Sequence, residues 1–125
     1  MKSVINTESA PAPIGPYNQA ILAGNTLYVS GQIAMDSNTK ELIMDTRENE
    51  THKVMTNLKA ILTAAGYNFS NVVKCSIFLA DMNDFPVVNE AYGSYFTRDY
   101  PARETVQVGK LPLGVNVEIS AIAVK

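Results

Sequence analysis

Residues 101–108 read Pro-Ala-Arg-Glu-Thr-Val-Gln-Val, and residues 115–124 read Val-Asn-Val-Glu-Ile-Ser-Ala-Ile-Ala-Val. Apolar residues recur at every second position in both stretches, which is the pattern of a half-buried β-strand. Pro112 and Gly114 lie between the stretches and favour a turn. We therefore predict that the two stretches form an antiparallel β-hairpin.

A four-residue loop between Gly109 and Gly114 would set the register of this hairpin. The expected facing pairs are Val108–Val115, Val106–Val117 and Thr105–Glu118. The polar side chains would then share the face away from the core: Arg103, Thr105, Glu118 and Ser120. A cation beside a carboxylate on rigid strands can bind a small anion and transfer a proton. From spacing alone, the favoured interpretation is an exposed cross-strand ion pair that contributes little stability.

Length and composition indicate one globular domain spanning residues 1–125. The chain has 46% hydrophobic and 18% charged residues, which is typical of a folded protein. Its formal charge of −2 and scattered basic residues do not favour a nucleic-acid partner. The lone Cys75 cannot form an intramolecular disulfide, and no apolar run approaches the ~20 residues that span a membrane. Because no leader-like segment is present either, we expect a cytoplasmic protein without a membrane partner.

The N-terminal third is expected to combine a stiff loop with a first hairpin. Prolines make residues 9–17 an extended loop that delivers Tyr17 to a defined position. Residues 18–22 and 26–30 are expected to pair around a Gly24-Asn25 turn. Gly31 allows close approach of a neighbour or ligand, and the strand is expected to continue past a bulge through residues 32–35.

The middle of the chain predicts two helices around one strand. Apolar residues at helical spacing predict a helix over residues 46–65, capped by Asp45 or Thr46 and ended by Gly66. Residues 72–79 alternate as a strand. A second helix is expected to begin after a cap within residues 81–84 and to end before Asp99. Pro86 would lie in its first turn. Its inward residues are expected to be Val88, Ala91, Tyr92, Tyr95 and Phe96.

These elements predict an α+β fold with a mixed sheet covered by two helices on one face. The opposite face would carry Phe78, Ile122 and Val124 among polar residues. Such a face would expose an apolar patch in a monomer, so we expect a homo-oligomer that buries it. The face carrying Arg103 and Glu118 would then lie at or near a subunit boundary.

Eight short motifs resemble, in order and spacing, the RidA/YjgF family of enamine/imine deaminases, which is also described as the endoribonuclease L-PSP family. They are Ile14-Gly15-Pro16-Tyr17, Val29-Ser30-Gly31-Gln32, Ala64-Ala65-Gly66, Val73-Lys74, Asp81-Met82-Asn83-Asp84-Phe85, Val88-Asn89, Pro101-Ala102-Arg103 and Val117-Glu118-Ile119. The resemblance implies a chorismate-mutase-like fold with a six-stranded mixed sheet, assembled as a homotrimer with clefts between subunits. It also implies hydrolysis of 2-aminoacrylate and 2-iminopropanoate to a 2-keto acid and ammonia, without a metal or organic cofactor.

The resemblance further assigns site residues. Arg103 would bind the substrate carboxylate, Glu118 would hold and polarise the attacking water, and Tyr17 would close the cleft and hydrogen-bond the substrate or the departing ammonia. The remaining substrate-binding positions would be Ser30, Gly31, Phe85, Asn89 and Thr105. Two positions depart from the family pattern: Thr105 stands where some members carry cysteine, and Ser120 stands where many members carry a second glutamate.

Several alternatives stay open. The Arg103 cleft could serve a non-catalytic trimer that senses a keto acid, and some relatives carry an endoribonuclease or translation-inhibitor label. Cys75 is expected to be a buried small hydrophobe, and His52 a solvated residue outside the helix's apolar stripe. Metal-ligand spacings and glycine-rich phosphate loops are absent from the sequence.

Overall fold

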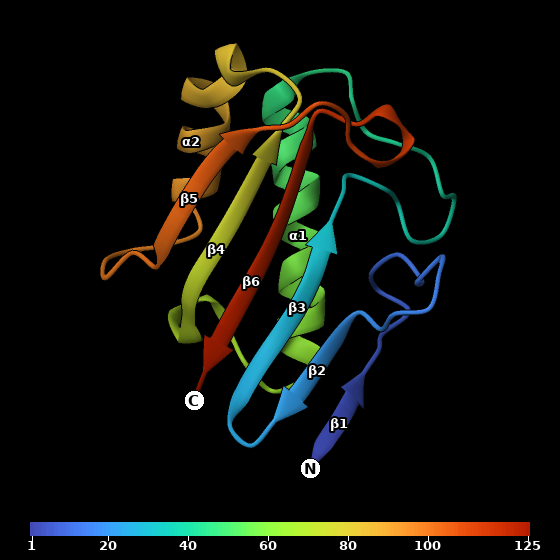
Figure 1. The fold of residues 1–125 in the computed structure, drawn as a ribbon, viewed down its shortest axis with the longest axis vertical. Helices are drawn as coiled ribbons and strands as arrows, with labels where there is room; N and C mark the ends of the chain where they lie inside the picture. Colours follow the sequence, from blue (N-terminus) through green and yellow to red (C-terminus); the bar gives the residue numbers. More distant parts are fainter.

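The computed structural model describes residues 1–125 and contains a six-stranded mixed sheet with both helices behind one face (Figure 1). The strand order is β1-β2-β3-β6-β4-β5. The strands are β1 (Lys2–Ile5), β2 (Ala20–Ala23), β3 (Thr26–Gln32), β4 (Val72–Leu79), β5 (Ala102–Gln107) and β6 (Val117–Val124), and the helices are α1 (Arg47–Ala64) and α2 (Phe85–Gly93). The predicted α+β class, mixed sheet and two-helix cover are confirmed.

The first hairpin is confirmed, with β2 antiparallel to β3 around a turn at Gly24, whose φ is 62°. The predicted bulge is also present, because the pairing of β3 with β6 shifts register between Val29 and Gln32. The edge strand β1 was not predicted. Its side chains are largely exposed, so the segment lacks the apolar alternation that reveals a half-buried strand.

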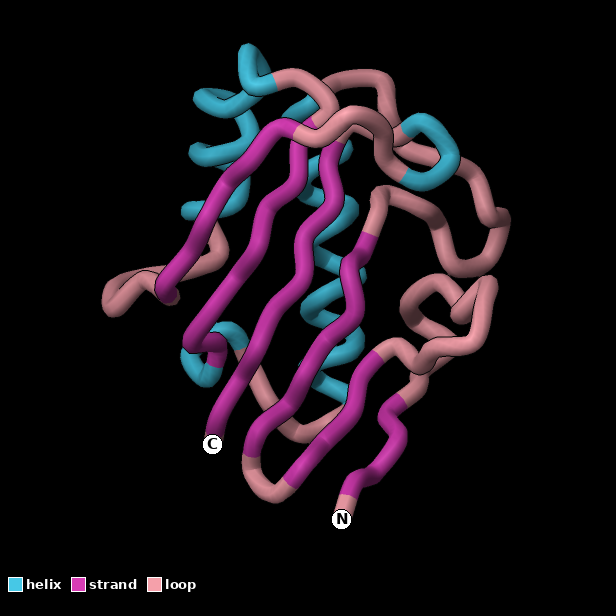
Figure 2. The backbone as a smooth tube through the Cα atoms, in the orientation of Figure 1, coloured by secondary structure: helices cyan, strands magenta, loops and turns pink.

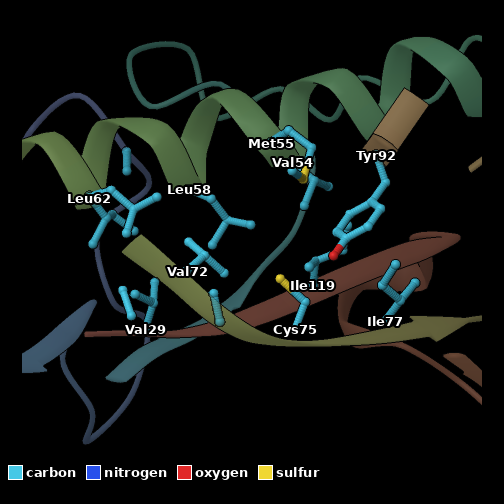
Figure 3. Close-up of a cluster of buried hydrophobic side chains, with 14 of the residues drawn as sticks. Val29, Val54, Met55, Leu58, Leu62, Val72, Cys75, Ile77, Tyr92 and Ile119 are labelled. Atoms are coloured by element: carbon cyan, nitrogen blue, oxygen red, sulfur yellow. The ribbon is translucent and has the colours of Figure 1, made fainter. Parts of the chain in front are cut away.

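Helix α1 begins and ends where its sequence signals predict. The Thr46 side chain accepts a hydrogen bond from the Asn49 amide and caps the first turn. Gly66 follows the helix with a φ of 79°, a conformation that favours glycine. The inner side of α1 packs on the sheet through buried residues that include Val54, Leu58 and Leu62 (Figure 3). No helix is both long enough and apolar enough to cross a membrane.

Helix α2 is shorter than predicted. It ends at Gly93, so Tyr95 and Phe96 lie beyond it, in a turn where their amides donate to the Tyr92 and Gly93 carbonyls. Phe96 is nevertheless buried, as expected, and Tyr95 is half-buried. Apolar spacing alone could not separate the end of a helix from a tighter turn that continues the same buried face.

The predicted C-terminal hairpin is wrong, although both of its strands exist. β4 lies between β5 and β6, and pairs parallel with β5 and antiparallel with β6 (Figure 2). The chain from β4 through α2 to β5 makes a β-α-β crossover, which requires parallel strands. The connection 108–116 then crosses the end of β4, where the Val108 amide donates to Leu79 and the Ala80 amide donates to Asn116.

This topology reverses part of the predicted face assignment. Thr105 pairs with Ile77 rather than Glu118, and Val106 is 40% exposed on the face opposite the helices. The apolar set of β6 is correctly placed: Val117, Ile119, Ala121 and Ala123 are buried, as is Val115 just before it. The alternation of apolar residues therefore predicted where the strands are. It did not predict which strands pair, because that depends on the crossover from β4 through α2 to β5.

A fully buried carboxylate fixes the start of β6. Glu50 of α1 accepts hydrogen bonds from the backbone amides of Asn116 and Val117 at 2.8 and 3.1 Å, and from the Asn116 side chain at 2.9 Å. Its other contact is with Arg47 Nε at 3.3 Å. This network ties α1 to the strand that carries Glu118 two positions later.

Candidate functional site

Arg103 lies on the helix side of β5, under α2. It pairs in the ladder with buried Cys75, so both side chains point to the same face of the sheet. Its Nη1 donates to Asn89 Oδ1 at 2.7 Å. The guanidinium carbon lies 5.6 Å from the centre of the Phe85 ring and 5.2 Å from the centre of the Tyr92 ring. One face of α2 therefore holds the cation through an amide and two aromatic rings.

The sequence of α2 explains this arrangement. Phe85, Asn89 and Tyr92 are separated by four and three residues, which places them on one side of a helix. Asn89, Tyr92 and Arg103 border a cleft of about 580 Å³, and Phe85 packs on Arg103 beside it. The residues that line the cleft are Asn89, Glu90, Tyr92, Gly93, Tyr100, Pro101 and Arg103.

Thr105 belongs to the same side of the sheet as Arg103. It follows Arg103 by two positions on β5 and pairs with buried Ile77. Its hydroxyl oxygen is buried and has no hydrogen-bond partner. Arg103, Asn89, Phe85 and Thr105 are thus brought to one half of the candidate site, which we name the arginine half.

Glu118 lies on the opposite, open face of the sheet. It pairs with Phe78, the neighbour of buried Ile77, and is itself half-buried. Burial raises the pKa of the Glu118 carboxyl above its ordinary value of 4.5. The carboxylate packs on Gly31 so closely that a Cβ at that position would overlap Glu118 Oε2. Glycine at the bulge therefore makes room for the carboxylate.

Tyr17 reaches the same region from the proline-rich loop. The Tyr17 side chain is 48% exposed, and it lines a small hollow of about 40 Å³ together with Gly31. Its hydroxyl accepts a 3.4 Å hydrogen bond from the Ile14 amide. Tyr17, Gly31 and Glu118 form the second half of the candidate site, which we name the glutamate half.

Ser30 is adjacent to the glutamate half, but its hydroxyl is occupied. It donates to the Asn18 carbonyl at 2.6 Å, and the Ser30 amide donates to the Gln19 carbonyl at 2.9 Å. These bonds tie β3 to the residues that follow the proline-rich loop. In this chain Ser30 therefore contacts the segment that follows Tyr17, and its predicted contact with substrate stays a prediction.

The two halves do not meet within one chain. β4 separates the strands that carry Arg103 and Glu118, and the two side chains point to opposite faces of the sheet. The prediction that Arg103, Thr105, Glu118 and Ser120 share a face is therefore wrong. Glu118 and Ser120 share the open face, where Ser120 pairs with Ser76, whereas Arg103 and Thr105 share the helix side.

Two positioning residues were missed by sequence reasoning. Tyr92 was assigned only to the core, yet its ring also covers Arg103; the spacing of Asn89 and Tyr92 on one helix face was the available signal. Gln19 is buried and its side-chain amide bonds Thr7, Ala10 and Pro11. A single glutamine at the start of a strand gives no sequence signal for such a role.

Cys75 and His52 both lie in surroundings that indicate a structural role. Cys75 is buried as predicted, and this burial raises the pKa of its thiol. The prediction of a solvated His52 is wrong, because its Nδ1 lies 2.8 Å from the Tyr95 hydroxyl and the ring is half-buried. No group of three or more histidine, cysteine or acidic side chains is arranged to hold a metal ion.

Comparison with known proteins gives consistent matches along the chain. The family model described as Endoribonuclease L-PSP matches residues 7–125. A RutC family protein of Pyrococcus horikoshii is 51% identical over 125 residues, covering 100% of this chain and 99% of that protein. The 2-iminobutanoate/2-iminopropanoate deaminase of Bos taurus is 47% identical, covering 100% of this chain and 91% of that enzyme. The crystal structure of RidA from an Antarctic Psychrobacter superposes with a TM-score of 0.95 at 42% identity, covering 98% of this chain and 99% of that one.

Proposed function

Because the chain belongs to the RidA/YjgF family, whose model is described as Endoribonuclease L-PSP, we propose that it hydrolyses small 2-imino acids to 2-keto acids and ammonia. The substrates would be 2-iminopropanoate and 2-iminobutanoate, or their enamine tautomers. The observation that carries the proposal is the geometry of Arg103, which α2 holds at the border of a cleft. The deaminase name of a relative 47% identical over its full match supports the reaction type.

Arg103 would bind the substrate carboxylate. Within this chain its Nη1 is bonded to Asn89, while Nε and Nη2 make no hydrogen bond to the protein. These two nitrogens form the planar fork that matches a carboxylate with two parallel bonds. A substrate held in this way would have its imine carbon at a fixed distance from the guanidinium, and fixed orientation lowers the entropic barrier to attack.

Glu118 would activate the attacking water. The raised pKa of its carboxyl makes the carboxylate a better proton acceptor than an exposed glutamate. The water oxygen adds to the imine carbon as Glu118 takes a water proton, and that proton is then given to the substrate nitrogen. In the resulting carbinolamine, the hydroxyl proton would pass through Glu118 to the nitrogen as the carbon–nitrogen bond breaks and the carbon–oxygen double bond forms, so ammonia leaves and the 2-keto acid remains. Tyr17 would close this side of the cleft and hydrogen-bond the substrate or the leaving ammonia.

A complete site would require two copies of the chain, because one substrate cannot touch both faces of a sheet. We propose a homotrimer in which the arginine half of one copy faces the glutamate half of its neighbour. The open face supports this arrangement: Val106 and Tyr28 are 40% and 50% exposed there, and Phe78 and Ile122 are half-exposed beside them. A second copy packed on this face would bury that apolar surface.

The proposal is tested by generating 2-iminobutanoate with a threonine dehydratase and measuring 2-oxobutanoate release with and without the protein. Wild type should accelerate release, and Arg103→Ala should not. Light scattering should give three times the 13.6 kDa mass of one chain. Binding of 2-oxobutanoate without any acceleration would instead favour a metabolite sensor, and RNA cleavage abolished by Arg103→Ala would favour the endoribonuclease alternative.

A further inference from the structure

The side chain of Tyr92 connects the candidate site to the hydrophobic core. Its ring belongs to the main buried cluster, is only 3% exposed and packs 5.0 Å from the Phe96 ring, centre to centre. The same ring lies 5.2 Å from the guanidinium carbon of Arg103. Figure 3 shows Tyr92 descending from α2 toward the sheet, with its hydroxyl on the side of Cys75. The ring is thus fixed by the core on one side and contacts Arg103 on another.

The hydroxyl of Tyr92 does not explain why an aromatic residue is present. Its oxygen is buried without a hydrogen-bond partner, and the nearby thiol of Cys75 is at most a weak one. A buried polar atom without a partner is a cost to stability rather than a gain. The useful part of the side chain is therefore the ring, whose negative face attracts a guanidinium.

The other contacts of Arg103 cannot immobilise it to the same degree. Asn89 is exposed and bonds only one of the terminal nitrogens, and Phe85 is partly exposed at the start of α2. A long arginine side chain loses substantial rotamer entropy when it is held in one conformation. Of the three contacts, only Tyr92 belongs to the buried cluster itself, whereas Phe85 is partly exposed and packs against the edge of that cluster.

We propose that Tyr92 is a positioning residue that orients Arg103 through its aromatic ring, so that the fork formed by Nε and Nη2 is already aimed at the substrate carboxylate before binding. This inference rests on the proposed function for its kinetic consequence. Its structural consequence, an immobile Arg103, holds whether or not the chain is a deaminase. The Tyr92 ring then contacts the face of the Arg103 guanidinium, and the Asn89 side chain accepts a hydrogen bond from its edge. Together the two contacts fix its orientation.

The kinetic test compares three variants in the 2-iminobutanoate assay. Tyr92→Leu removes the ring and should raise KM about 10-fold with little change in kcat, because carboxylate binding serves ground state and transition state alike. Tyr92→Phe keeps the ring and should retain KM within about twofold. Phe96→Leu is the matched control, since Phe96 packs on Tyr92 in the same core and has no contact with Arg103. An equal rise of KM in Phe96→Leu, or no rise in Tyr92→Leu, would overturn the proposal.

A second measurement separates this inference from the proposed function. The arginines of the chain are Arg47, Arg98 and Arg103, so the Nε–Hε signals in arginine-labelled protein can be assigned by substitution. In wild type and Tyr92→Phe, the Arg103 signal should show a rigid side chain, whereas exposed Arg98 should be mobile. Tyr92→Leu should make Arg103 as mobile as Arg98. If Tyr92→Leu does not fold, Phe85→Leu should increase Arg103 mobility less than twofold while Tyr92 remains; a fully mobile Arg103 in that variant would contradict the proposal.

Discussion

Arg103 and Glu118 lie on opposite faces of one sheet, although sequence alternation placed them on the same face. Arg103 pairs with Cys75 of β4 on the helix side, and Glu118 pairs with Phe78 of β4 on the open side. The two residues are two strands apart and three residues apart along β4, which corresponds to about 10 Å across and about 10 Å along the sheet. A direct ion pair between them within one chain is therefore excluded, and each is available to a ligand.

Arg103 should account for most of the binding of the substrate carboxylate. Arg103→Ala should lower kcat/KM for 2-iminobutanoate by about 10²–10³-fold, because two charged hydrogen bonds are lost. Arg103→Lys keeps the charge without the fork and should recover only part of this loss. Steady-state kinetics with the spontaneous hydrolysis subtracted checks both values. A lysine variant as active as wild type would show that the planar fork is not needed.

The acid limb of the pH–rate profile should report Glu118. The carboxylate form accepts the water proton, and burial raises the carboxyl pKa, so activity should rise with pH through a midpoint above 4.5. Glu118→Gln should lower kcat by about 10²-fold or more while 2-oxobutanoate still binds. Calorimetry of keto-acid binding provides the control. A Glu118→Gln enzyme that kept both its rate and its acid limb would remove Glu118 from the mechanism.

Gly31 should be required because of the carboxylate beside it. A methyl group in Gly31→Ala would overlap Glu118 Oε2 and lie 2.9 Å from Glu118 Cδ, so the Glu118 side chain must move. We expect kcat to fall by about 10-fold or more, since small displacements of a catalytic group are costly. Gly109→Ala, where a Cβ meets no atom within 4 Å, is the matched control and should be unaffected. Equal activity in the two variants would contradict the prediction.

Glu50 should matter for stability rather than for binding. Glu50→Ala leaves the amides of Asn116 and Val117 and the cation of Arg47 without their buried acceptor, which should cost about 3–5 kcal/mol. Chemical denaturation measures this change in the free energy of unfolding. The exposed variant Glu90→Ala, also on a helix, should change it by less than about 0.5 kcal/mol. A loss below 1 kcal/mol in Glu50→Ala would show that water replaces the carboxylate.

The sequence predicted those parts of the fold that depend on local patterns. The cap at Thr46, the turn at Gly24 and the bulge near Gly31 each follow from the preferences of single residues. The partner of β5 does not, because alternation in a strand is the same whichever strand lies beside it. That choice came from the crossover through α2, and the exposed edge strand β1 left no apolar pattern to read.

The candidate site also divides into features that local sequence patterns predict and features that depend on how the elements pack. Motif similarity located Arg103, Glu118, Gly31 and Tyr17, and the structure divides them between two faces. Asn89, which motif similarity predicts to contact substrate, also accepts a hydrogen bond from Arg103, and this contact was not predicted. A contact between two site residues, such as this one, depends on how closely α2 packs on β5. The spacing of residues within either element carries no information about that distance.

The most direct test of a site shared between copies is subunit mixing. Arg103→Ala and Glu118→Gln chains, each inactive alone, would be co-expressed in equal amounts and purified together, without selection for mixed oligomers. Each site should take its arginine half and its glutamate half from different copies, so about one quarter of the sites would be intact after random assembly. The predicted result is that the mixture of the two chains has about one quarter of wild-type activity. A mixture no more active than either parent would contradict a site built from two chains.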